Sequence, residues 1–180
     1  MDTLMSFRDE LKREDFDAIP FMNADGYHSK TIAYSIWHIF RIEDIVAHSL
    51  IKGDEQAFFA GGYRERIGSP IITTGNELVG QDIEEFSGRF DIGELYSYAA
   101  EVKESTERMI RGLSYADLKR RIPDGRRALL ESLNVVSTDE SAVWLIDYWC
   151  GKDIRGLIRM PFSRHWIMHT EACLRIRKAL

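Results

Sequence analysis

Apolar residues recur at helical spacing near the N-terminus. Leu4, Phe7 and Leu11 lie three and four residues apart, with charged residues between them. This spacing places the three side chains on one face of a helix and leaves the charged residues on the other. The pattern predicts a first helix over residues 3–13.

A second, more apolar helix is predicted over residues 31–51. Ser29 is a suitable N-cap, and Gly53 can end the helix in the left-handed conformation. The apolar positions cover most of the circumference, so we expect this helix to be buried among others at the centre of the fold. These positions are Ile32, Ala33, Ile36, Trp37, Ile39, Phe40, Ile42, Ile45 and Val46.

Residues 54–90 interrupt the helical pattern. Adjacent glycines, a Gly-Ser-Pro sequence and a further glycine break the segment. They leave room for short helical turns near residues 55–63 and 77–86. We interpret residues 54–90 as a long crossover between the second and third helices.

The second half of the chain returns to helical periodicity. Asp91 and Glu94 match a capping box, and apolar residues then recur at helical spacing as far as Leu113. A basic connector follows over residues 119–127. Further helices are predicted over residues 128–133, over residues 141–149 and from near Pro161 to the C-terminus, with Gly151 and Gly156 separating the last two.

The periodicity as a whole predicts an all-α fold. No segment alternates as a strand would, and no internal repeat is present, so sheets and solenoids are excluded. The composition, with 44% hydrophobic residues, 29% charged residues and 4 prolines, is that of an ordinary globular protein. We therefore expect a single helical bundle domain over residues 1–180.

The charge and hydrophobicity of the chain argue against nucleic-acid and membrane partners. With 24 basic and 29 acidic residues the formal charge is −5, which disfavours binding to nucleic-acid phosphates. No apolar run is long enough to span a membrane, and the N-terminus lacks the apolar stretch of a secretory signal. We expect a cytoplasmic protein with no membrane partner, in which Cys150 and Cys173 are buried thiols and not a disulfide.

His165 and His169 are the first candidates for chemistry. They lie four residues apart in a predicted helix, about 40° apart around its axis, so both rings can reach one metal ion. The pair has the frame of a zincin peptidase, but Trp166 stands where that class has its catalytic glutamate. A peptidase of that kind is excluded, and two ordinary surface or core histidines are the alternative interpretation.

A third ligand has to come from elsewhere, and His38 is the best candidate because it lies midway along the most apolar helix. A buried imidazole needs hydrogen-bond partners. The alternative is a core histidine bonded to a backbone carbonyl, to Tyr34 or to Arg41. His28 and His48 lie near helix ends, about 80° from the face of His38, and are predicted at the surface.

Three further features are weaker candidates. Cys173 continues the face of the histidine pair by one turn, and a thiolate binds zinc well, but a free cysteine in an apolar helix is usually part of the core. The basic connector could receive an anionic substrate, although such a run is usually solvated. The tryptophans are interpreted as core, with one or two able to wall a ligand pocket beside the histidines. They are Trp37, Trp144, Trp149 and Trp166.

Two segments resemble the DinB/YfiT-like superfamily. The first is HSKTIAYSIWHIFRIEDIVAH in the second predicted helix, which contains a W-H-I motif followed by a basic residue and an acid. The second is MPFSRHWIMHTEACLRI near the end of the chain, with its H-x-x-x-H. The order and approximate lengths of the first three predicted helices also match. Residues 54–90 are the part that the resemblance explains least.

The resemblance implies a four-helix bundle of down-up-down-up topology with a long second connection, often dimeric. It also implies a divalent metal, zinc or nickel, held by three histidines, which by motif are His38, His165 and His169. The activities implied are transfer of low-molecular-weight thiols to electrophiles, thiol-dependent isomerisation and metal-dependent hydrolysis.

We therefore expect a homodimeric, metal-dependent enzyme that acts on a small-molecule substrate. A thiol transferase comes ahead of a hydrolase, because a metal can activate a thiol without a separate general base. The alternative is a non-catalytic helical module that binds a metal or a hydrophobic ligand in stress response. An open metal coordination position facing a pocket would favour the enzyme.

Overall fold

The computed structural model describes residues 2–180, and it is built from helices. This range contains no strand and one isolated bridge, between Arg121 and Asp153, so the predicted all-α class is confirmed. None of its helices is both long enough and apolar enough to cross a bilayer. The helices are α1 (Asp2–Glu10), α2 (Ile32–Asp44), α3 (Ala57–Ala60), α4 (Tyr63–Ile67), α5 (Gln81–Gly88), α6 (Ile92–Gly112), α7 (Asp124–Leu133), α8 (Glu140–Cys150), α9 (Ile154–Arg159) and α10 (His165–Ala179).

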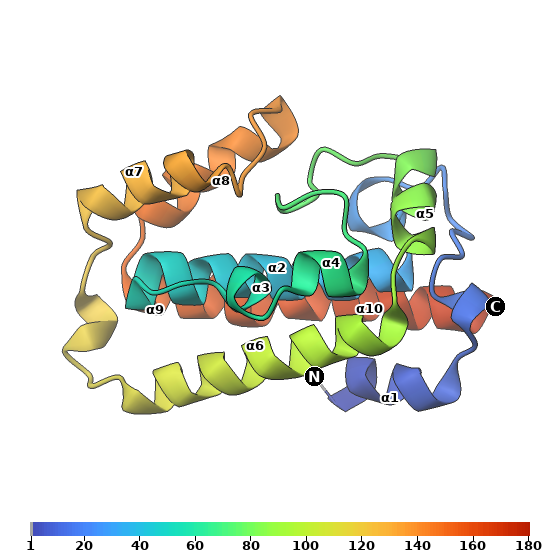
Figure 1. Ribbon diagram of the computed structural model, residues 1–180, viewed down its shortest axis with the longest axis horizontal. Helices are drawn as coiled ribbons and strands as arrows, with labels where there is room; N and C mark the ends of the chain where they lie inside the picture. The colour runs from blue at the N-terminus through green and yellow to red at the C-terminus, as the bar shows by residue number, and fades with distance from the viewer. Residues whose placement is uncertain (1) are drawn as a thin grey trace.

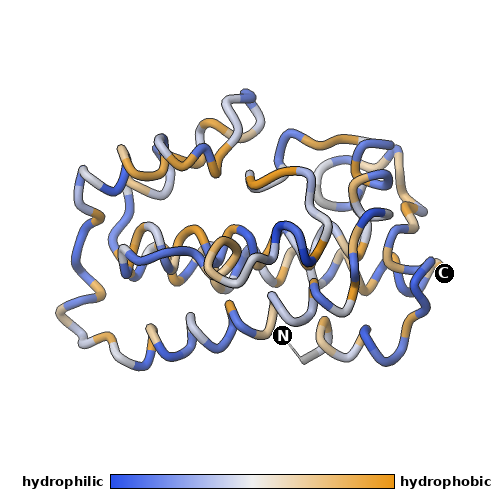
Figure 2. The backbone as a smooth tube through the Cα atoms, viewed as in Figure 1, coloured by the Kyte–Doolittle hydropathy of each residue, from blue (hydrophilic) through white to orange (hydrophobic). Residues whose placement is uncertain are grey.

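The central element is α2 (Figure 1). Every residue of α2 is buried, as its apolar pattern predicts, and the helix packs against α6 and against α10. α1 packs on the same two helices, α6 and α10. Figure 2 shows hydrophilic and hydrophobic segments alternating along α6, as expected of a helix with one buried face.

α2 begins and ends differently from the prediction. Its N-cap is Thr31, whose side chain accepts from a backbone N–H of the first turn, and not Ser29. After Asp44 the path continues as a π-helix over Ile45–Lys52, which ends at Gly53 with φ of 79°. The wider turn of a π-helix changes which side chains face the interior.

The crossover over residues 54–90 packs its short helices against α2 and α6. Asp44 caps α3, because its carboxylate accepts from two backbone N–H groups of α3 at 2.9 Å each. Gly75 has φ of 76°, and a β-carbon there would lie 2.9 Å from the Trp37 ring. The position therefore requires glycine, and the close approach holds the neighbouring loop on the face of α2.

Several predicted helices are present with shifted ends. α1 ends at Glu10 and does not reach residue 13. α6 begins after Asp91, whose side chain accepts from Glu94 N at 3.0 Å, as the capping pattern predicts. α7 begins at Asp124, earlier than predicted, and it packs on α8 and on the π-helix that extends α2.

The last helical segment starts well before Pro161. α9 begins after Asp153, whose carboxylate accepts from Gly156 N at 2.7 Å, so Gly156 lies inside a helix instead of ending one. A π-turn over Met160–Arg164 then joins α9 to α10. His165 consequently lies inside a longer helical path and not at its positive end.

Candidate metal centre

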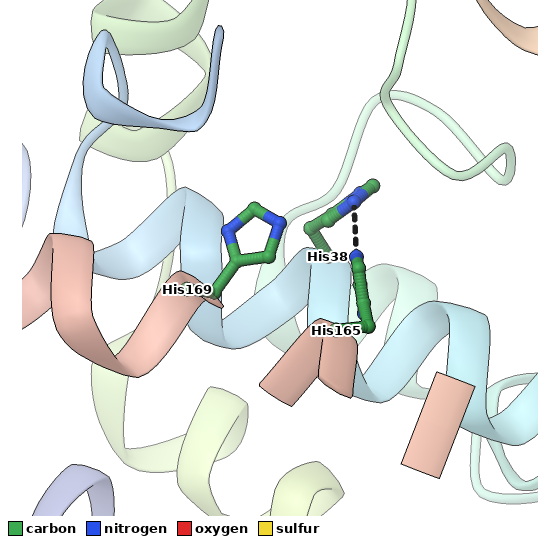
Figure 3. Close-up of side chains that lie close together, drawn as sticks. All are labelled: His38, His165 and His169. Atoms are coloured by element: carbon green, nitrogen blue, oxygen red, sulfur yellow. Dashed lines mark hydrogen bonds between the residues drawn. The ribbon is translucent and has the colours of Figure 1, made fainter. Parts of the chain in front are cut away.

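The three histidines predicted from the sequence come together in space. His38 lies midway along α2, and His165 and His169 lie one turn apart at the start of α10. A ligand nitrogen from each ring lies within 4.8 Å of the others, and Figure 3 shows the rings converging from the two helices. The packing of α10 on α2 is fixed beside them by Trp166, whose Nε1 donates to Glu43 Oε2 at 2.7 Å.

The neighbours of His38 fix its tautomer. Its Nδ1 lies 2.5 Å from the carbonyl oxygen of Thr74, so Nδ1 carries the proton and donates it. The Tyr34 ring stacks on the imidazole with centroids 5.3 Å apart. In the neutral ring, Nε2 therefore carries a lone pair, and it points at His165 Nε2, 3.1 Å away. In a metal-binding histidine, one ring nitrogen usually donates a hydrogen bond to a carbonyl or carboxylate while the other ring nitrogen binds the metal.

All three imidazoles are held in the neutral form. Burial lowers the pKa of His38 and of His169 well below the usual value near 6.5, and the charges of neighbouring histidines lower both further. Burial also lowers the pKa of His165 to about 4. Neutral imidazole is the form that binds a metal, so the site is in its ligating state at neutral pH.

The hydrogen-bonding pattern fits a bound cation. His165 Nδ1 is buried with no hydrogen-bond partner among the described residues. If His165 carries its proton on Nδ1, its Nε2 lone pair faces the lone pair of His38. If the proton is on Nε2, that nitrogen donates to His38 Nε2 and the buried Nδ1 lone pair lacks a donor. A cation that accepts both Nε2 lone pairs removes the repulsion between them and leaves a single buried N–H to satisfy.

A pocket of about 480 Å³ opens onto the three histidines. It lies between α2, α8 and the start of α10, and most of its wall is apolar or aromatic. Lys30 is the one charged residue among the described residues that line it, and no carboxylate is among them. The other lining residues are Gly26, Tyr34, Ile42, Asn76, Ser141, Trp144, Leu145, Tyr148, Trp149, Met160, Pro161 and Met168.

The prediction that His48 lies at the surface is wrong. Its side chain is buried in the π-helix, where Nδ1 lies 2.7 Å from Asp54 Oδ1 and Nε2 lies 3.0 Å from Ser105 Oγ. Every residue from Ile45 to Ile51 is buried, so His48 is covered along with the rest of its segment. His28 is partly exposed, near Glu171 of α10, and neither histidine belongs to the cluster.

The weaker candidates fall outside the cluster or on its edge. Cys173 is fully buried in the core, where burial raises the pKa of its thiol to about 12. Arg120, Arg121 and Arg126 of the basic connector line a second pocket of about 510 Å³ that contains none of the three histidines. Of the tryptophans, Trp144 and Trp149 line the histidine pocket, whereas Trp37 and Trp166 are buried in the core.

Sequence reasoning missed two groups at the site. Thr74 acts through its backbone carbonyl, which every residue type carries, so no sequence signal marks it. Lys30 directly precedes α2, and a lysine beside a predicted N-cap gives no sign that it faces a pocket.

A crystal structure of a conserved protein from Enterococcus faecalis is similar to this chain, with a TM-score of 0.67 and 10% sequence identity. The alignment covers 98% of this chain and 88% of that one. At this identity the likeness shows a shared fold and says nothing of function. No protein-family model matches the sequence, and no curated protein matches it.

Proposed function

We propose that His38, His165 and His169 hold one divalent metal and that the pocket beside them is the active site of a metal-dependent enzyme. The observation that carries this proposal is the convergence of three neutral imidazoles on one point at the wall of a pocket. Zinc or nickel suits imidazole ligands. When bound, the metal would supply Lewis acidity and lower the pKa of a thiol or of water.

The residues of the chain would position and shield the reacting groups. Thr74 and Tyr34 fix the orientation of the His38 ring. Trp144, Leu145 and Trp149 on α8 form an apolar wall of the pocket that also contains the histidines. No acid lines the described pocket, so no carboxylate is in place as a general base. We therefore place transfer of a low-molecular-weight thiol to a small electrophile ahead of hydrolysis.

We also propose the finer architecture that the DinB/YfiT-like resemblance implies. In this proposal α1, α2 with its π extension, α6 and α10 form a four-helix bundle of down-up-down-up topology, and two chains form a homodimer. The mutual packing of α2 with α6 and α10, and of α1 with the same two helices, supports the bundle. Analytical ultracentrifugation tests the dimer, and a sedimentation coefficient of a monomer at micromolar concentration would contradict it.

Metal content after replacement of each histidine tests the site. Protein made without affinity nickel should bind about one zinc or nickel ion per chain. His38→Ala, His165→Ala and His169→Ala should each lose most of this metal, because two imidazoles hold a metal much more weakly than three. The matched control is His28→Ala, which removes a histidine outside the cluster and should keep full metal content. Full loading of His38→Ala would contradict the proposed ligand set.

Turnover separates the enzyme from a non-catalytic ligand-binding module. Metal-loaded protein should conjugate a low-molecular-weight thiol to a chlorinated aromatic, with a rate that rises as pH increases because the thiolate is the nucleophile. His169→Ala should abolish the activity and His28→Ala should not. Equal turnover by metal-free and metal-loaded protein would contradict the mechanism. Full metal binding without turnover of any thiol would favour the module.

A further inference from the structure

Lys30 has an unusual environment for a charged side chain. It is half-buried at the end of the loop before α2, and its Nζ lies 4.9 Å from the centroid of the Tyr34 ring. Within the described part of the chain, its ammonium makes one hydrogen bond, to the carbonyl oxygen of Leu78 at 3.3 Å. Within residues 2–180 no salt bridge includes Lys30.

The position of Lys30 is also unusual for this chain. The protein carries 29 acidic residues against 24 basic ones, yet none of the acids lines the pocket into which Lys30 faces. The ammonium is close enough to the cluster for its charge to lower the pKa values of His38 and His169. Among the described residues that line the pocket, Lys30 is thus the one with a full charge.

A half-buried ammonium without a carboxylate partner is costly, because it has lost part of its hydration and gained no counter-charge. An anion bound in the pocket would supply that partner through a short, charge-assisted hydrogen bond. The remaining wall, built by Trp144, Tyr148, Met160 and Met168 among others, would take up an apolar or aromatic body.

We propose that the pocket binds a small aromatic molecule with a single anionic group, which pairs with Lys30 while the body of the molecule lies along α8 and reaches the three histidines. Pairing with Lys30 and contact with the aromatic wall do not require a bound metal. The assignment of this molecule as a substrate rests on the proposed metal-dependent function. The volume of about 480 Å³ is within the usual range for sites that enclose a small organic ligand.

Two dyes that differ by one sulfonate test the proposal on metal-free protein. Anilinonaphthalene sulfonate is an aromatic anion, and phenylnaphthylamine has the same rings without the charge. Wild-type protein should bind the anion more tightly than the neutral dye, as measured by fluorescence titration. Lys30→Met should weaken binding of the anion by about tenfold or more, since a charged hydrogen bond is lost, and should leave binding of the neutral dye unchanged.

Three further variants define the site. Lys30→Arg keeps the charge and should retain most of the affinity for the anion. Lys119→Met removes an exposed lysine of the connector and should change neither dye, which controls for net charge. Trp144→Ala should weaken both dyes, because this ring forms part of the pocket wall. Lys30→Gln replaces Lys30→Met if the methionine variant does not fold.

The dye titrations test the ligand pocket independently of the proposed enzyme activity, because no metal is present in them. Weaker binding of the anionic dye alone in Lys30→Met supports the proposed pocket whether or not metal-loaded protein turns over a thiol. Equal affinity of wild-type protein for the two dyes would overturn the proposal. So would an equal effect of Lys30→Met and Lys119→Met on the anion.

Discussion

Two contacts orient the His38 imidazole for metal binding. The Thr74 carbonyl accepts a hydrogen bond from Nδ1–H, and the Tyr34 ring stacks on the imidazole, so Nε2 is directed at His165 in the metal-free protein. Three neutral imidazoles buried close together are costly to protonate, because each new charge would be desolvated and close to the other rings.

This burial predicts the pH dependence of stability of the metal-free protein. Unfolded histidines have pKa values near 6.5, whereas the folded values are lower, at about 4 for His165. Below pH 6.5 the unfolded chain therefore binds protons that the folded chain does not, and the free energy of unfolding falls as pH decreases toward 4. Free imidazole becomes protonated near pH 6.5. The folded histidines stay neutral to lower pH, so metal binding should also persist below pH 6.5.

Urea denaturation of metal-free protein between pH 7 and pH 4 measures this effect. His165→Asn cannot take up a proton, so its free energy of unfolding should fall less steeply with decreasing pH than that of wild-type protein. An identical slope for the two proteins would show that His165 is not held neutral by the fold.

At the scale of elements, Asp44 joins three helices. From the end of α2 it accepts from the first N–H groups of α3 and from Tyr98 Oη of α6, the latter at 3.0 Å. It also pairs with Arg41 at 3.6 Å, and both side chains are fully buried. Removing one member of such a pair leaves an uncompensated charge in the core.

Asp44→Ala should therefore lower the free energy of unfolding by roughly 3–5 kcal/mol. The matched control is Asp139→Ala, which removes an exposed N-cap carboxylate from α8 and should cost only about 1 kcal/mol. Chemical denaturation of the two variants measures the difference. Similar losses in both would mean that the Asp44 network contributes no more than an ordinary helix cap.

Elements differ in how far the sequence could predict them. The apolar spacing predicts α1, α2, α6 and α8 because each has one face, or its whole surface, in the core. The π-turns leave no such signal, since residues that fit a π-helix also fit an α-helix. His48 was predicted at the surface from its angle to His38 and its place near a helix end, whereas the whole segment over residues 45–51 is buried. Gly156 was expected to end a helix, whereas Asp153 caps a helix that contains it.

The site was predictable to a similar extent. His165 and His169 follow from helical spacing, and His38 follows from its place in the most apolar helix and from the family resemblance. Thr74 and the pocket wall on α8 depend on how distant segments pack, and helical periodicity carries no information about that packing.

At the scale of the whole molecule, the pocket lies where two hydrophobic clusters meet. One cluster contains residues of α1, the first part of α2, the crossover, α6 and α10. The other contains residues of the π extension of α2, α7, α8 and α9. Tyr34 belongs to the first, whereas Ile42, Leu145 and Trp149 belong to the second, and all four line the pocket. A ligand there would contact both clusters, between helices that the two clusters hold in place.

A metal at the three histidines would link α2 to α10 and so stabilise the whole chain. At a free metal concentration about 100 times the dissociation constant, binding to the folded state alone contributes about 2.7 kcal/mol. For a protein of this size each kcal/mol raises the melting temperature by about 2–4 °C. Zinc or nickel should therefore raise the melting temperature of chelator-treated protein by roughly 5–10 °C, as followed by circular dichroism.

His28→Ala should show the full increase, whereas His38→Ala should show almost none. An equal increase in His38→Ala would place the stabilising metal away from the proposed centre.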